Sequence, residues 1–157
     1  MKVPTLYLDT SVIGGYFDPE FEDATRELWK QKDQGRYCFY TSPTFLREIT
    51  EAPEVVRNLF TATFHDSKFF LDVNDEAAAL AQAYLQQKAV PPRYADDAVH
   101  VAVAVVHRID FVVSWNFRHL VNVQRNDVFN AVNLLQGYPS VRIVNPLELI
   151  YGSEEKN

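Results

Sequence analysis

The chain has 157 residues, of which 47% are hydrophobic and 23% are charged, a balance typical of one globular domain with its own core. The net charge of −6 argues against broad, non-specific binding to nucleic acid, which requires an excess of basic groups. A single cysteine, Cys38, excludes a framework of internal disulfides, and no apolar run is long enough to span a membrane. We expect a cytoplasmic protein without a signal peptide, with one domain over 1–151 and a polar tail over 152–157.

The first half of the chain is predicted to alternate between strands and helices. Apolar and β-branched runs favour strands, and apolar positions at helical spacing favour helices. Ser42 followed by Pro43 is typical of a helix start, with the serine as the cap and the proline in the first turn. In chain order we expect a strand at 5–8, a helix at 24–32, a strand at 37–41, a helix starting at 42–43, a helix at 54–64 and a strand at 68–73.

The second half continues the alternation. Asn74 is the expected cap of a helix at 75–88, because its side chain can accept a free backbone N–H. The expected elements are a helix at 75–88, a helix at 96–106, a strand at 109–113, a helix at 125–135, a strand at 141–144 and a short helix at 145–150. Strands that alternate with helices from end to end predict an α/β fold, with a parallel β-sheet flanked by helices on both faces.

The helix expected at 96–106 organises the chain. Ala98–Val106 is apolar except for His100, so this helix should be buried on most sides. Two acids, Asp96 and Asp97, stand at its beginning, where a carboxylate suits the positive end of the helix and can accept a backbone N–H. An acid at the mouth of a buried helix either caps that helix or holds a cation.

Three acids are placed where strands end or helices begin: Asp9, Glu48 and Asp97. In a parallel sheet such positions can converge on the edge where ligands bind, and Asn116, which follows the strand at 109–113, can join them. Clustered carboxylates repel one another, and a hard divalent cation such as Mg²⁺ relieves that repulsion. Such an ion lowers the pKa of a bound water and neutralises charge that builds on a phosphate.

The same side chains have structural explanations that the sequence leaves open. An acid after a strand can cap the next helix, an acid within a helix can face solvent, and Ser or Asn after a strand can form a turn. A lone histidine on an apolar helix is more often a hydrogen-bonded structural residue than a functional one. These explanations apply to Asp9, Glu48, Asp96, Asp97, His100, Ser114 and Asn116.

Four segments resemble the PIN domain, the fold of many ribonucleases that depend on Mg²⁺ or Mn²⁺. They occur in the family's order and spacing and are Leu6–Val12, Phe45–Ile49, Asp97–Ala104 and Phe111–Leu120. The resemblance implies that Asp9, Glu48 and Asp97 bind the metal and act in catalysis. Asn116 stands where many family members carry a fourth acid or an asparagine, so it is the fourth expected catalytic residue.

Further roles are expected around these acids. Ser114 matches a small hydroxyl residue of the family, and with Thr10 it would orient ligands or water through hydrogen bonds. Asp96 lies beside the matched acid, where it would cap the helix or support the metal ligands. Arg47 and Arg118 are close to the expected site in sequence and would hold phosphates that flank the cleaved bond.

These features predict a Mg²⁺- or Mn²⁺-dependent endoribonuclease with RNA as its substrate. The family and the size of the chain imply the toxin of a VapBC-type toxin–antitoxin pair, with a cognate antitoxin protein and formation of a homodimer. The alternative is a catalytically weak PIN-like module that binds RNA or protein, favoured by Asn116 in place of an acid and by the acidic net charge. A nuclease acting on DNA also stays open, because the same metal chemistry serves both nucleic acids.

Overall fold

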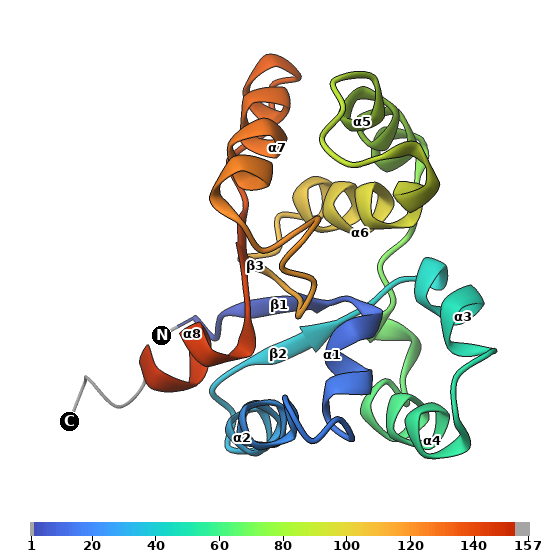
Figure 1. The fold of residues 1–157 in the computed structure, drawn as a ribbon, viewed down its shortest axis with the longest axis vertical. Helices are drawn as coiled ribbons and strands as arrows, with labels where there is room; N and C mark the ends of the chain where they lie inside the picture. The colour runs from blue at the N-terminus through green and yellow to red at the C-terminus, as the bar shows by residue number, and fades with distance from the viewer. Residues whose placement is uncertain (1, 153–157) are drawn as a thin grey trace.

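Four short parallel strands form the centre of the computed structural model, which describes residues 2–152 (Figure 1). They are β1 (Thr5–Leu8), β2 (Cys38–Tyr40), β3 (Phe111–Val113) and β4 (Arg142–Val144), in the spatial order β2-β1-β3-β4. Each neighbouring pair is parallel, so the carboxyl ends of all four strands lie along the same edge of the sheet. Ligands bind at this edge in open parallel sheets.

Helices cover both faces of the sheet (Figure 1), and side chains that alternate along the strands pack against one face or the other. Tyr7 and Val112 point to one face, and Leu8 and Val113 to the other. The first face packs against α5 (Asp75–Gln86), α6 (Ala95–Val106) and α7 (Val123–Leu135). The second face packs against α1 (Thr10–Gly15), α2 (Glu22–Asp33), α3 (Pro43–Ile49), α4 (Glu54–Thr63) and α8 (Pro146–Gly152). The predicted α/β fold, with a parallel sheet and helices on both faces, is confirmed.

Helix α6 is the central helix of the first face. Most of its residues from Ala98 to Val105 are buried, which accounts for the apolar run in the sequence. The helix begins at Ala95, after a short 3-10 turn at Pro92–Tyr94, and it carries Asp96 and Asp97 in its first turn. The burial of α6 therefore fixes both acids at one end of the sheet.

The strand predicted at 68–73 is wrong. Ser67–Phe69 forms a 3-10 turn, in which the Asp66 side chain accepts the backbone N–H of Lys68. Phe70 makes one isolated parallel bridge with Thr41 at the edge of β2, through two backbone hydrogen bonds. Phe69 and Phe70 are partly buried against the core of the second face, so packing rather than a β-ladder explains these aromatic residues.

Other local predictions hold or fall outside the described part of the chain. Asn74 caps α5 as predicted, by accepting the backbone N–H of Ala77. The tail predicted at 152–157 lies outside the described residues, apart from Gly152, where α8 ends. Among the helices of residues 2–152, none has the length and apolar character needed to cross a membrane.

Helix α1 contains adjacent glycines in different surroundings. A Cβ on Gly15 would lie 2.7 Å from the Trp115 ring and 3.0 Å from the Thr25 hydroxyl, whereas a Cβ on Gly14 would meet nothing within 4 Å. Gly15 therefore allows the close approach of α1 to Trp115.

We expect Gly15→Ala to destabilise the protein by about 1–3 kcal/mol, because the new methyl group overpacks the Trp115 contact. Gly14→Ala is the matched control, and it should be neutral or stabilise the helix by up to about 1 kcal/mol. Urea unfolding of both variants measures the difference. Equal stability of the two variants would show that the close approach does not constrain this position.

Candidate active site at the carboxyl edge of the sheet

Asp9 follows β1 directly and is only 3% exposed. It occupies the position before α1, but its side chain makes no capping hydrogen bond to that helix. Instead Ser11 donates a hydrogen bond to Oδ1 (2.6 Å) and Ser114 donates one to Oδ2 (2.5 Å). Burial raises the pKa of Asp9, and the two hydroxyl groups oppose that shift. Two serines from separate segments, rather than a helix cap, thus hold this carboxylate.

Glu48 in α3 ends a chain of hydrogen bonds that begins in the core. Thr10 donates to its Oε2 (2.5 Å), and its Oε1 lies 2.6 Å from Nε2 of His100. The other ring nitrogen of His100 lies 2.5 Å from the Tyr7 hydroxyl, which lies 2.7 Å from the Ser42 hydroxyl. Tyr7, Ser42 and His100 are fully buried. Glu48 is therefore a positioned side chain and not a freely solvated helix acid.

The shifts in pKa favour an ion pair between Glu48 and His100. Burial acts to raise the pKa of Glu48, but the hydrogen bond and charge of His100, followed by the Thr10 hydrogen bond, lower it overall. Burial acts to lower the pKa of His100, but the hydrogen bond and charge of Glu48, with the charges of Asp9 and Asp97, raise it overall. When His100 is protonated, both ring nitrogens donate, one to Glu48 and one to the Tyr7 oxygen.

Asp97 stands in the first turn of α6, where no side chain makes a capping hydrogen bond. Burial raises its pKa to about 7, and the charge of Asp9 adds to the shift, while His100 opposes it. Glu48 and Asp96 raise the pKa further. The structure thus brings Asp9, Glu48 and Asp97 within electrostatic range of one another at the carboxyl edge of the sheet.

Asn116 joins this group from the loop after β3. Its Nδ2 donates to Oδ2 of Asp97 over 3.4 Å, and its Oδ1 accepts the backbone N–H of His119 (3.0 Å). Its own backbone N–H donates to the Ser114 hydroxyl (2.8 Å). The amide is therefore oriented with its nitrogen toward the acids.

The acids at this edge offer the oxygen donors that a divalent cation such as Mg²⁺ prefers. Within residues 2–152, no three Asp, Glu, His or Cys side chains are grouped so that they could hold a metal ion. Mg²⁺ retains several waters, however, and needs only one or two protein carboxylates. Asp9 and Asp97 would meet that smaller requirement, because the charge of Asp9 raises the pKa of Asp97 and a cation would relieve that repulsion. Glu48 lies beside them with both oxygens hydrogen-bonded to protein groups.

The basic residues expected at the site lie at its exposed margin. Arg47 forms an ion pair with Asp96 (3.3 Å), and both side chains are largely exposed. Asp96 therefore faces Arg47 at the surface instead of capping α6. Arg118 is exposed in the loop after β3. An exposed pair of this kind contributes little to stability, so Arg47 remains able to exchange Asp96 for another anion.

Sequence reasoning missed part of the network that holds the acids. Ser42, predicted to cap α3, makes no capping hydrogen bond, because its hydroxyl is turned to Tyr7. Ser11 donates a hydrogen bond to Asp9, a role that the sequence did not predict. His100 has the structural hydrogen bonds expected of a buried histidine, but one of its partners is the acid Glu48. The one available signal was the helical spacing that places His100 one turn after Asp97.

The fold and this acidic site define an α/β protein with clustered carboxylates at the carboxyl edge of its sheet. No family model matches the sequence, and no curated protein matches it. Several solved structures share the fold. Two of them are FitAcB from Neisseria gonorrhoeae (16% identity, 90% of this chain and 98% of that chain, TM-score 0.56) and DNA-bound VapBC from Salmonella typhimurium (20% identity, 91% and 98%, TM-score 0.56). At these identities the likeness shows the fold alone.

Tyr7→Phe should destabilise the protein by about 1–3 kcal/mol, because it leaves His100 and Ser42 with unsatisfied polar atoms in the core. The control is Tyr138→Phe, which removes a hydroxyl that bonds Glu76 at an exposed position. Chemical unfolding of both variants provides the comparison. A loss for Tyr7→Phe no larger than that for Tyr138→Phe would contradict the role of the buried chain.

Asp97→Asn should stabilise the metal-free protein at pH 8. The pKa of Asp97 is about 7 in the folded protein and 3.8 ordinarily, so the folded protein binds this proton more tightly than the unfolded chain does. The free energy of unfolding of the wild type is therefore unaffected by Asp97 below pH 3.8 and falls as the pH rises from 3.8 to 7. The gain of the variant should therefore grow by about 1.4 kcal/mol per pH unit between pH 4 and 7, reaching at most about 4 kcal/mol, and then level off.

Urea unfolding in EDTA at pH 4.5, 6 and 8 tests this pH dependence. Asp33→Asn is the control, because Asp33 is exposed at the end of α2, where the chain enters the opposite edge of the sheet. A difference between wild type and Asp97→Asn that does not change with pH would contradict the raised pKa.

Proposed function

We propose that this chain is a PIN-like endoribonuclease that depends on Mg²⁺ or Mn²⁺ and acts as the toxin of a toxin–antitoxin pair. The observation that carries the proposal is the meeting of Asp9, Glu48 and Asp97 at the carboxyl edge of a parallel sheet. The fold likeness to VapBC and FitAcB supports a protein partner. Formation of a homodimer, implied by the PIN resemblance, belongs to the same proposal.

The residues of the chain divide the work of such a reaction. Asp9 and Asp97 would hold the divalent ion, which when bound supplies a water of lowered pKa and neutralises charge on the scissile phosphate. Glu48 is kept ionised by His100 and Thr10, so it can accept a hydrogen bond from an attacking water. Asn116 presents an amide N–H beside Asp97, and the exposed side chains of Arg118 and Arg47 would contact flanking phosphates.

A PIN-like binding module is the second candidate. One observation favours it: both oxygens of Asp9 and both oxygens of Glu48 already accept hydrogen bonds from protein groups. Such a protein would bind RNA or a partner without turnover. Thermal unfolding with and without Mg²⁺ or Mn²⁺ separates the two candidates, because only the nuclease requires stabilisation by the ion.

Purified protein should cleave single-stranded RNA in the presence of Mg²⁺ or Mn²⁺ and should lose this activity in EDTA. Asp9→Asn and Asp97→Asn should each lower the rate by about 100-fold or more, since each removes a charge that the reaction requires. Asp33→Asn, at the opposite edge of the sheet, should retain the wild-type rate.

DNA of the same sequence, assayed in parallel, distinguishes the two possible substrates. Cleavage of RNA but not DNA is the expected result. Activity that survives EDTA, or that is equal in Asp97→Asn and wild type, would remove the proposed chemistry.

A further inference from the structure

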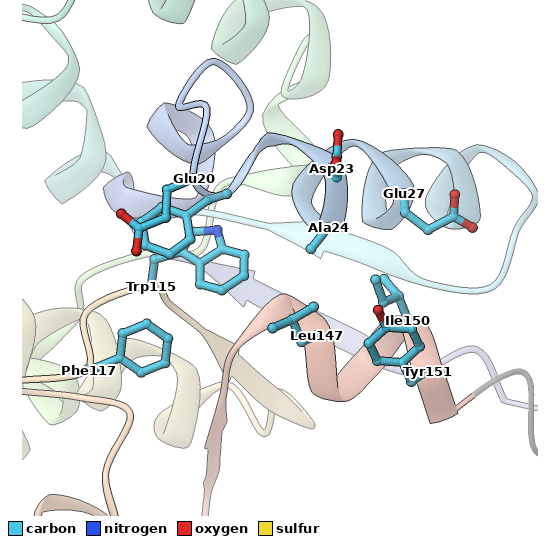
Figure 2. Close-up of a pocket in the computed structure, with 10 residues that line it drawn as sticks. Glu20, Asp23, Ala24, Glu27, Trp115, Phe117, Leu147, Ile150 and Tyr151 are labelled. Atoms are coloured by element: carbon cyan, nitrogen blue, oxygen red, sulfur yellow. The ribbon is translucent and has the colours of Figure 1, made fainter.

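A groove of about 510 Å³ lies between α2 and α8 and reaches the loop after β3 (Figure 2). Phe117, Leu147 and Tyr151 are 47%, 40% and 58% exposed, which is high for large apolar side chains that lie together. The apolar residues along the groove are Phe21, Ala24, Trp115, Phe117, Leu147, Ile150 and Tyr151. A joined patch of exposed apolar side chains with a hollow between them is typical of an interaction surface.

The inner end of the groove is rigid. Trp115 donates a hydrogen bond from its indole N–H to Thr25 (2.9 Å), and its ring stacks on Phe21 with the centroids 4.3 Å apart. Gly15 lies against the same indole, where a larger residue would not fit. A site formed before binding lowers the entropy cost of association, because its side chains need not be ordered by the ligand.

The rim of the groove on the α2 side is acidic. Glu20, Asp23 and Glu27 line it, and no basic residue does so among the described residues (Figure 2). Arg26 is turned away from the groove, since it donates to the Tyr16 carbonyl, lies over the Tyr16 ring and pairs with Glu22. A ligand that buries apolar groups in the groove would therefore lie next to the negative charges of this rim.

We propose that this groove is the docking surface for an amphipathic segment of a partner protein, with apolar side chains that enter the groove and Arg or Lys side chains that pair with the rim. A short helix suits the site, because Asp23 and Glu27 lie one turn apart on α2, about 6 Å, and Glu20 precedes that helix on the same rim. Complementary charge at the rim would favour this segment over an acidic one.

The inference rests on the part of the proposed function that gives the chain a protein partner, and it is independent of catalysis. The groove is nevertheless close to the acidic site. Trp115 and Phe117 line it, and Asn116 between them donates to Asp97. Ser11, which holds Asp9, also accepts the backbone N–H of Trp115. A segment in the groove would thus contact the loop that orients Asn116.

Selection from a library of random 15-residue peptides displayed on phage, with the full-length chain as bait, tests the proposal. The enriched peptides should combine spaced apolar residues with two or more Arg or Lys. Synthetic copies should bind about tenfold or more weakly to Phe117→Ala and to a double variant carrying Asp23→Lys and Glu27→Lys, because these remove an apolar contact and reverse the rim charge.

Two controls match these variants. Leu135→Ala alters a 79% exposed apolar side chain outside the groove, and Asp33→Lys reverses an exposed charge at the far end of α2. Both should bind the peptides as wild type does. Thermal unfolding of every variant verifies that weaker binding does not reflect loss of folding.

Several results would overturn the docking surface. They are the absence of any enriched peptide, an acidic or neutral consensus, and equal binding by the groove variants and the controls. Sedimentation of the free chain tests a second copy as the occupant, and a dimer that Phe117→Ala dissociates would also overturn the proposal.

The outcome for docking is separable from the outcome for catalysis. Asp9→Asn should bind the peptides as wild type does while it loses RNA cleavage. Absence of cleavage in every variant would contradict the nuclease but leave the peptide result intact. Loss of peptide binding in Asp9→Asn would overturn the separation of the groove from the acidic site.

Discussion

Three carboxylates at one edge of the sheet repel one another, and the other residues of the site reduce the cost of that repulsion. Each acid is accommodated differently. Asp9 is buried against two serine hydroxyls, Glu48 is paired with His100, and Asp97 retains its proton up to a pKa of about 7. Burial raises the pKa of both Asp9 and Asp97, whereas His100 helps to lower the pKa of Glu48. A positive partner would therefore relieve Asp9 and Asp97 more than Glu48, which His100 already pairs.

The pairing of Glu48 with His100 depends in turn on the core. Helix α6 is buried against the sheet, so a histidine on its inner face must find polar partners within the protein. Tyr7 supplies one from β1 and passes the chain of hydrogen bonds on to Ser42. A buried network in which the members are satisfied restricts the possible orientations of each side chain. The orientation of Glu48 at the surface is thus set by packing several residues deeper.

The sequence was sufficient for the architecture and for the approximate place of the acids. Periodic apolar patterns indicate which segments are strands and which are helices. Parallel strands bring their carboxyl ends to one edge, so the sequence alone could place Asp9 and Asp97 together there. The network around them could not be derived, because Tyr7 and His100 are 93 residues apart and no local spacing links them. The strand expected at 68–73 is absent because apolar aromatic residues indicate burial, and a buried residue can belong to a strand or to a turn. Whether the acids bind metal and cleave RNA stays a prediction.

The groove and the acidic site are neighbours because four consecutive residues alternate between them. Ser114 and Asn116 contact Asp9 and Asp97, while Trp115 and Phe117 line the groove. The backbone between these side chains is short and is pinned by Ser11 and Ser114. Because Asn116 is bonded directly to both Trp115 and Phe117, a displacement of either neighbour would also move Asn116. The same loop that completes the acidic site is therefore the part of the molecule through which a bound segment would act on it.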